Sequence, residues 1–139
     1  IGIVGSDIKA KDKVALNAKN IDISSAESSL YERSSNRNGY TINEIKRNRE
    51  SNIETKNINM EAKKDIDIKG SNIVAKNEAN IKADGDINIV SATDSRFYAH
   101  KETNKGKFGK SSSEENILST SSTSPFFNNS HTLFLRFFM

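Results

Sequence analysis

The chain repeats one apolar skeleton three times, over residues 5–26, 50–69 and 70–92. Each copy opens with an isoleucine and closes on two isoleucines that flank one polar residue. Six apolar columns run through the copies: Ile8/Ile53/Ile73, Val14/Ile58/Ala79, Leu16/Met60/Ile81, Ala18/Ala62/Ala83, Ile21/Ile66/Ile87 and Ile23/Ile68/Ile89. Equivalent residues of the adjacent second and third copies lie 20 or 21 positions apart. A repeat of this length indicates a solenoid, in which each unit buries its apolar face against its neighbours.

Apolar and polar residues alternate within each copy, as in Ile66-Asp67-Ile68. This is the period of a β-strand, whereas on a helix the two isoleucines would lie about 200° apart. The runs are short and end at Asn, Asp, Gly or Ser, which favour turns. The copy length fits one coil of a β-helix with three strands and three corners, and the leucine-rich pattern of similar length is absent. We therefore predict an all-β solenoid of about three coils.

One polar column also runs through the three copies. Asp7, Asn52 and Asn72 each follow a serine and precede an isoleucine. Stacked coils bring equivalent side chains to about 4.8 Å from one another, where asparagines can exchange hydrogen bonds as a ladder. The alternative is that Asp and Asn stand here only because they favour turns. The sequence leaves both explanations open.

The 139 residues fit one domain with three regions. Residues 1–95 form the repeat region, with coils at 5–26, 50–69 and 70–92 and an excursion at 27–49. Residues 96–124 form a second, basic and Ser-rich excursion or linker, and residues 125–139 an atypical Phe-rich tail. Residues 1–4 match the end of a preceding coil.

Both excursions leave the repeat at the same phase, after the similar segments SSAESS and SATDS. In the first, Asn38-Gly39 followed by Tyr40, Ile42 and Ile45 predicts a β-hairpin outside the coils. The second is richer in Ser, Lys and Gly, and we expect the chain to be partly disordered beyond about Ser95.

The second excursion is basic. Lys101, Lys105, Lys107 and Lys110 lie in it beside aromatic residues. Loops on a rigid scaffold often carry binding sites, and a basic loop suits an acidic glycan, lipopolysaccharide or nucleic acid. The alternative is a solvated loop whose lysines keep the solenoid soluble. No nucleic-acid-binding module surrounds the loop, so a specific nucleic-acid partner is not expected.

Catalytic motifs are absent from the sequence. His100 and His131 each stand alone, and no nucleophile motif or phosphate-binding glycine loop is present. Four acids, Asp65, Asp67, Asp84 and Asp86, leave open a polysaccharide-cleaving groove or a calcium site, although the nonapeptide calcium pattern is missing. We predict no enzyme activity, no cofactor, and no catalytic, cofactor-binding or metal-ligating residues. The lack of cysteine excludes a disulfide framework, and no run of 18 apolar residues spans a membrane.

The third copy and the residues after it resemble a known family. GSNIVAKNEANIKADGDINIVSATDS, followed by a Lys/Gly/Ser-rich stretch ending in FGKSSS, is similar to the haemagglutinin repeat of filamentous haemagglutinin-type exoproteins. The same repeat occurs in contact-dependent growth inhibition exoproteins of Gram-negative bacteria. The resemblance covers residues 5–113.

The resemblance implies a right-handed parallel β-helix that is exported by two-partner secretion. It further implies a secreted or outer-membrane-associated protein that attaches to surfaces or forms the stalk that displays a toxin. The implied partners are further repeats of the parent exoprotein, an outer-membrane two-partner transporter, and glycans or receptors on host or bacterial cells. The alternative function is a binding module whose basic loops engage acidic glycans, lipopolysaccharide or nucleic acid.

The Phe-rich tail has two explanations. Its composition differs abruptly from that of the repeats, which favours an out-of-frame ending that is disordered. The alternative is an unusual cap whose aromatic residues close the solenoid. With open ends, three coils bury little more than the ordering entropy costs. We therefore expect a marginally stable chain that stacks end to end or aggregates.

Overall fold

The prediction of an all-β protein is confirmed. The computed structural model describes residues 1–106, 108–123, 126–129 and 132–137, and the side chains of residues 1–104 and 108–122. The described residues contain strands and no helix, and hence none long and apolar enough to cross a membrane. The strands are β1 (Gly2–Val4), β2 (Asp7–Lys9), β3 (Lys13–Ala18), β4 (Ile21–Ser24), β5 (Ala26–Asn36), β6 (Gly39–Arg49), β7 (Asn52–Ala62), β8 (Ile66–Lys69), β9 (Asn72–Ala83), β10 (Ile87–Val90), β11 (Ala92–Gly106), β12 (Gly109–Thr123), β13 (Phe126–Asn129) and β14 (Thr132–Phe137).

The strands belong to two compact units. The first, here called the coil unit, comprises Ile1–Ala26, Asn48–Ala92 and Thr123–Met139. The second, the hairpin unit, comprises Glu27–Arg47 and Thr93–Ser122.

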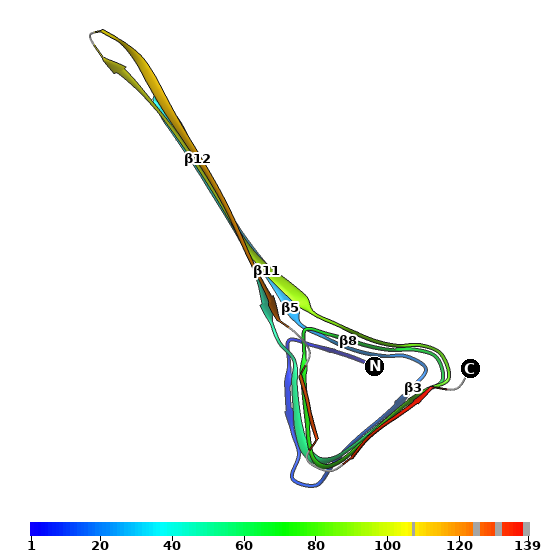
Figure 1. The fold of residues 1–139 in the computed structure, drawn as a ribbon. Coiled ribbons are helices and arrows are strands. Elements are labelled where there is room, and N and C mark those ends of the chain that lie inside the picture. The colour runs from blue at the N-terminus through cyan, green and yellow to red at the C-terminus, as the bar shows by residue number, and fades with distance from the viewer. Residues whose placement is uncertain (107, 124–125, 130–131, 138–139) are drawn as a thin grey trace. The chain divides into compact units, whose positions relative to one another are not determined.

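Each coil of the coil unit follows three sides of a triangle (Figure 1). On the first side, β2, the start of β7, the start of β9 and β13 lie next to one another in that order. On the second side, β3, the end of β7, the end of β9 and β14 follow in the same way. The third side is the parallel sheet β1-β4-β8-β10. Strand β7 passes from the first side to the second at a register irregularity between Thr55 and Asn57. All six apolar columns predicted from the sequence are paired in register.

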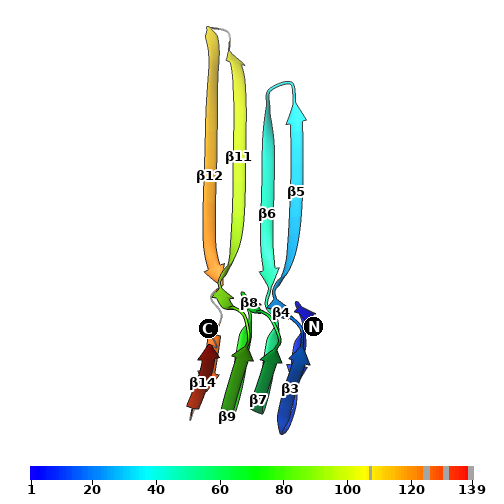
Figure 2. The same ribbon diagram turned by 90° about the vertical axis from the view of Figure 1, so that its right-hand side faces the viewer.

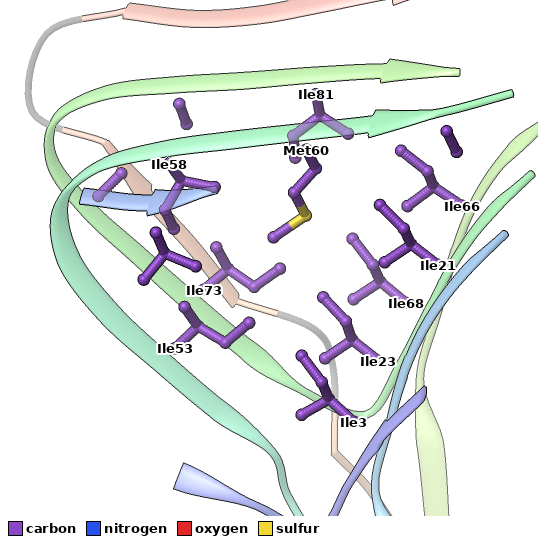
Figure 3. Packing of buried hydrophobic residues seen from close by; sticks show 14 of the residues in the cluster. Ile3, Ile21, Ile23, Ile53, Ile58, Met60, Ile66, Ile68, Ile73 and Ile81 are labelled. Carbon is purple, nitrogen blue, oxygen red and sulfur yellow. The ribbon is translucent and has the colours of Figure 1, made fainter. Parts of the chain in front are cut away.

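The columns form the core of the coil unit. Ile21, Ile66 and Ile81 are completely buried, and Ile53 is 1% exposed. Figure 3 shows these side chains pointing into the triangle from its three sides. Burying one such side chain contributes about 1.5–3 kcal/mol, so the repeated isoleucines supply the main stabilisation of the stack.

Two tight corners of the coil unit require glycine. Gly5 and Gly70 have φ of 52° and 50°, a left-handed conformation that other residues adopt at a cost. A Cβ at either position would also lie closer than 3.0 Å to an alanine Cβ, that of Ala26 or Ala92. Each corner therefore excludes a side chain both by its backbone conformation and by its packing.

The prediction of a disordered tail is wrong for residues 126–129 and 132–137; residues 124–125, 130–131 and 138–139 lie outside the described residues. Strands β13 and β14 pair in parallel with β9. Phe127 is in register with Ile73, Leu133 with Ala79, and Leu135 with Ile81. The tail thus continues the apolar columns along an edge of β9 that would otherwise leave its backbone groups unpaired.

The hairpin unit is a four-stranded sheet in the order β12-β11-β6-β5 (Figure 2). The predicted first hairpin is confirmed: β5 and β6 are neighbours, and the side chain of Asn36 accepts hydrogen bonds from the amides of Asn38 and Gly39. The expectation of disorder beyond Ser95 is wrong for residues 96–106 and 109–123, which lie in β11 and β12. Their polar sequence forms strands because β11 pairs antiparallel with β6, from Ser95 opposite Lys46 to Glu102 opposite Gly39.

Tight corners and hairpins alternate along the chain. The corner at Gly5 is followed by the β5–β6 hairpin, then by the corner at Gly70 and the β11–β12 hairpin. Both hairpins follow a strand of the third side, β4 or β10, as the shared phase of the excursions predicted. Within the hairpin unit the two hairpins pair with each other through β6 and β11.

Candidate binding surface

The predicted polar ladder is present on the first side of the coil unit. The Asn52 side-chain amide donates to Asp7 Oδ1 at 2.7 Å, and that of Asn72 donates to Asn52 Oδ1 at 3.0 Å. The Asn72 amide also donates to a carboxylate oxygen of Glu50. These residues hydrogen-bond to one another along the stack, so the ladder stabilises the coils, and turn preference alone does not explain it.

A charged ladder lies beside the polar one. Glu54 stands between Lys9 and Lys76, with Nζ–Oε distances of 3.6 and 3.2 Å. The hydrogen bond from Lys76 and its positive charge, with a smaller effect of Lys9, hold the pKa of Glu54 below its ordinary value. These side chains are exposed, so the two ion pairs contribute little to stability.

Two of the four acids considered for a groove or a calcium site, Asp65 and Asp67, accept hydrogen bonds that link neighbouring coils. Asp67 Oδ1 accepts from the Asn88 side-chain amide at 2.9 Å, and Asp65 Oδ1 accepts from the backbone amide of Asp86 at 3.0 Å. Gly85 lies against the same Asp65 oxygen. Among the side chains that the structure describes, no three His, Asp or Glu residues come close enough together to hold a metal ion.

The basic residues of the second excursion are partly neutralised. Lys101 Nζ lies 3.3 Å from Glu114 Oε2, and the hydroxyl of Tyr40 donates to the same carboxylate at 3.4 Å. The hydrogen bond and charge of Lys101 lower the pKa of Glu114. Lys110 is exposed on β12, whereas Lys107 and the side chain of Lys105 lie outside the described part. The described lysines therefore do not form an uncompensated basic patch.

His100 is tied into the hairpin sheet. Its Nδ1 lies 3.1 Å from Thr41 Oγ1 on the neighbouring strand, and its ring stacks on Tyr98 with centroids 6.4 Å apart. Glu102 is 4.0 Å from Nε2. These contacts position the ring between neighbours in the sheet. His131 lies outside the described residues.

The outer strands of the hairpin sheet carry exposed apolar side chains, which the sequence analysis did not single out. On β5, Leu30 and Tyr31 are 48% and 61% exposed, and on β12, Ile117 and Leu118 are 49% and 69% exposed. We call these four residues the edge patch. Adjacent residues of a strand point to opposite faces, so both faces of each outer strand carry one apolar side chain. Strands β5 and β12 are the two opposite edges of the sheet, so the edge patch comprises two separate apolar pairs, each a candidate contact point on an exposed edge strand. The signal was two apolar pairs inside Ser-rich, polar strands.

The repeats of this chain match those of a known protein family. The model of the Hemagglutinin repeat family matches residues 1–45 and residues 41–124, a range that includes all three coils and both hairpins. The chain belongs to the hemagglutinin repeat family. No curated protein and no solved structure matches it. Membership in the hemagglutinin repeat family, whose repeats are structural and adhesin-like, supports a repeat segment of a larger, secreted, adhesin-like protein.

Proposed function

We propose that this chain is a segment of a right-handed parallel β-helix from a secreted bacterial exoprotein, in which the coils serve as a stalk and the hairpins carry the surface for attachment. The observation that carries the proposal is that the coils and the hairpins differ in what they bury and what they expose. The coils hold a repeated core and self-satisfied polar ladders, and their inner third-side strands β4 and β8 bury their isoleucines completely. The hairpins contribute no described residue to that core and carry the exposed apolar pairs of the edge patch. A stalk needs the first property and an attachment surface needs the second.

The family match supports the wider setting of the proposal. In that setting the chain is exported by two-partner secretion through an outer-membrane transporter and stands at the bacterial surface among further repeats. Its partners are glycans or receptors of host or bacterial cells, or its stalk displays a toxin domain of the parent protein. The proposal also includes the domain boundaries expected from the sequence, between residues 95 and 96 and between residues 124 and 125.

Attachment can be tested with the whole chain immobilised on beads and mixed with epithelial or bacterial cells. Replacing all four residues of the edge patch with serine leaves the coil core untouched and keeps polar strands like their Ser-rich surroundings. We expect attachment to fall at least about tenfold, which corresponds to a loss of 1.4 kcal/mol. A matched control replaces Ser29 and Ser119 on the same strands with alanine. Unchanged attachment of the serine variant would refute the assignment of attachment to the hairpins.

The alternative binding function is addressed by the same beads. Replacing Lys101, Lys105, Lys107 and Lys110 with glutamine should leave attachment unchanged, because Glu114 already compensates Lys101. If this variant lost attachment, and if attachment of the parent chain fell steeply with added salt, acidic glycans or lipopolysaccharide would be the ligands.

A further inference from the structure

Three lysines stand at equivalent positions of the three coils, at the corner between the first and second sides: Lys11, Lys56 and Lys76. Each lies two residues beyond the first-side column that pairs Lys9 with Glu54 and Glu54 with Val74. Thr55 and Ala75, which precede two of the lysines, are paired in register and buried, whereas all three lysines are exposed. We call the three lysines the lysine column.

The lysine column lines a hollow on the surface of the coil unit. The hollow has a volume of about 480 Å³, and its other charged lining residues are Lys9 and Glu54. Four ammonium groups therefore share it with a single carboxylate. A hollow with this excess of positive charge attracts anions.

Only part of this positive charge is compensated within the coil unit. Glu54 lies between Lys9 and Lys76, at Nζ–Oε distances of 3.6 and 3.2 Å. Lys11 and Lys56 form no ion pair with any side chain that the structure describes. One carboxylate thus serves two ammonium groups, and two others are left for a ligand.

The lysine column does not stabilise the coils. Neighbouring strands lie about 4.8 Å apart, and like charges that face each other across them destabilise a sheet. The adjacent columns of the first side avoid this cost, since Asn52 donates to Asp7 and Lys9 pairs with Glu54. The repeated lysine is therefore better explained by a ligand that carries several negative charges.

The residues around the hollow favour an acidic glycan over a nucleic acid. Single-stranded nucleic acids bind cationic grooves that also hold aromatic side chains, and the described lining has none. The carboxylate of Glu54 only accepts hydrogen bonds. The hydroxyl groups of a sugar can donate to it, whereas the phosphodiester backbone of DNA offers no donor. The sugars of an extended glycan also recur at nearly the rise of one coil, about 4.8 Å.

We propose that the lysine column binds an acidic glycan that lies along the stack, with sulfate or carboxylate groups of successive sugars against the ammonium groups of successive coils. Each contact is a charge-assisted hydrogen bond. Because the lysines are exposed, binding weakens as salt is added. This site belongs to the coil unit, so it goes beyond the proposed function, which assigns attachment to the hairpins.

The experiment titrates the whole chain with dextran sulfate at low and at physiological salt, with unsulfated dextran as the neutral probe. Replacing the three residues of the lysine column with glutamine should lower the affinity for dextran sulfate at least about tenfold and reduce its salt dependence. The matched control replaces Lys19, Lys63 and Lys64 with glutamine. It removes the same charge from exposed residues of another corner and should change the affinity by less than about twofold. Unsulfated dextran should not bind.

Equal affinities of the column variant and the control variant for dextran sulfate would overturn the site. A single-stranded oligothymidine that bound as tightly as dextran sulfate, and lost its binding in the column variant, would overturn the assignment to a glycan. Far-UV circular dichroism checks the fold. If the column variant lost its strand signal, Lys56→Gln alone, which breaks no ion pair, makes the same test with a smaller effect. The serine variant of the edge patch should bind dextran sulfate as the parent chain does, so the proposed function and the lysine column can fail separately.

Discussion

Replacing Gly70 with alanine should destabilise the coil unit for two separable reasons. The left-handed backbone, with φ of 50°, costs an alanine about 1–2 kcal/mol. The added methyl group would lie closer than 3.0 Å to the Cβ of Ala92, and relieving such overpacking costs about 1–3 kcal/mol. Together these give about 2–5 kcal/mol, a large fraction of the stability of a small domain.

A double-mutant cycle separates the two reasons. Ala92→Gly removes the methyl group that meets the new Cβ and should cost about 0.5–1 kcal/mol through chain entropy. In Gly70→Ala/Ala92→Gly the backbone strain and this entropy remain, together with the milder contacts of the new Cβ with Ser25 Oγ at 3.1 Å and the Ala92 nitrogen at 3.2 Å. We therefore expect the double variant to be more stable than the sum of the single changes predicts, by about 1–3 kcal/mol.

The free energy of unfolding of the parent chain and the three variants of the cycle is measured by urea unfolding followed by circular dichroism. The protein concentration is one at which light scattering shows no assembly. Gly2→Ala is the matched control, because nothing lies within 4 Å of a Cβ there and φ is not positive. Its stability should not fall, and the chain-entropy argument used for Ala92 allows a gain of up to about 0.5–1 kcal/mol. Strictly additive effects of the Gly70 and Ala92 changes would refute the steric part of the reasoning.

Three further predictions concern single positions in the coil unit. Ile68→Asp should destabilise by more than about 4 kcal/mol, or prevent folding, because it buries an unpaired charge, whereas Lys69→Ala should shift the urea midpoint little. Thr55→Val should raise the free energy of unfolding by about 1 kcal/mol, and the melting temperature with it. The reason is that the hydroxyl of Thr55 is buried without a hydrogen-bond partner among the described residues. The pKa of Glu54 is lower in the folded than in the unfolded chain, so the contribution of Glu54 to stability is present above its ordinary pKa of 4.5 and is lost as the pH falls through the folded pKa. The melting temperature of Glu54→Gln should therefore depend less on pH in this acidic range than that of the parent.

The stacked columns were predictable from the sequence because parallel stacking permits few registers. A shift of one residue would turn every core isoleucine outward, so the spacing of the apolar residues determines which residues pair. Ile53 therefore meets Ile8 and Ile73, and Met60 meets Leu16 and Ile81, as the spacing predicts. The polar ladder follows from the same register.

The tail was misjudged because its composition hid its spacing. Phe127, Leu133, Leu135 and Phe137 follow one another at the intervals of Ile73, Ala79, Ile81 and Ala83, with which they pair. Aromatic residues replace aliphatic ones, and the turn residues of the other copies are absent. Comparing intervals, and not residue types, would have identified the tail as a continuation of the stack.

Strand β12 was not predictable from its own sequence. Residues 109–123 are mainly Ser, Thr and Glu, a polar composition typical of disordered segments. They form a strand because β11 offers a paired neighbour, and β propensity depends strongly on such context. The edge patch was missed for the same reason, since its position on an outer strand depends on the order β12-β11-β6-β5.

The alternation of corners and hairpins explains how such a repeat can vary without losing its fold. The strands of the first hairpin, β5 and β6, have 11 residues each, and those of the second, β11 and β12, have 15 each. The two hairpins nevertheless pair in one continuous register, from Ser95 opposite Lys46 to Glu102 opposite Gly39. The third-side strands of the coils keep their own register across both insertions, from Ile21 through Ile66 to Ile87. The length of a hairpin can therefore vary while the pairing of the coil strands stays the same.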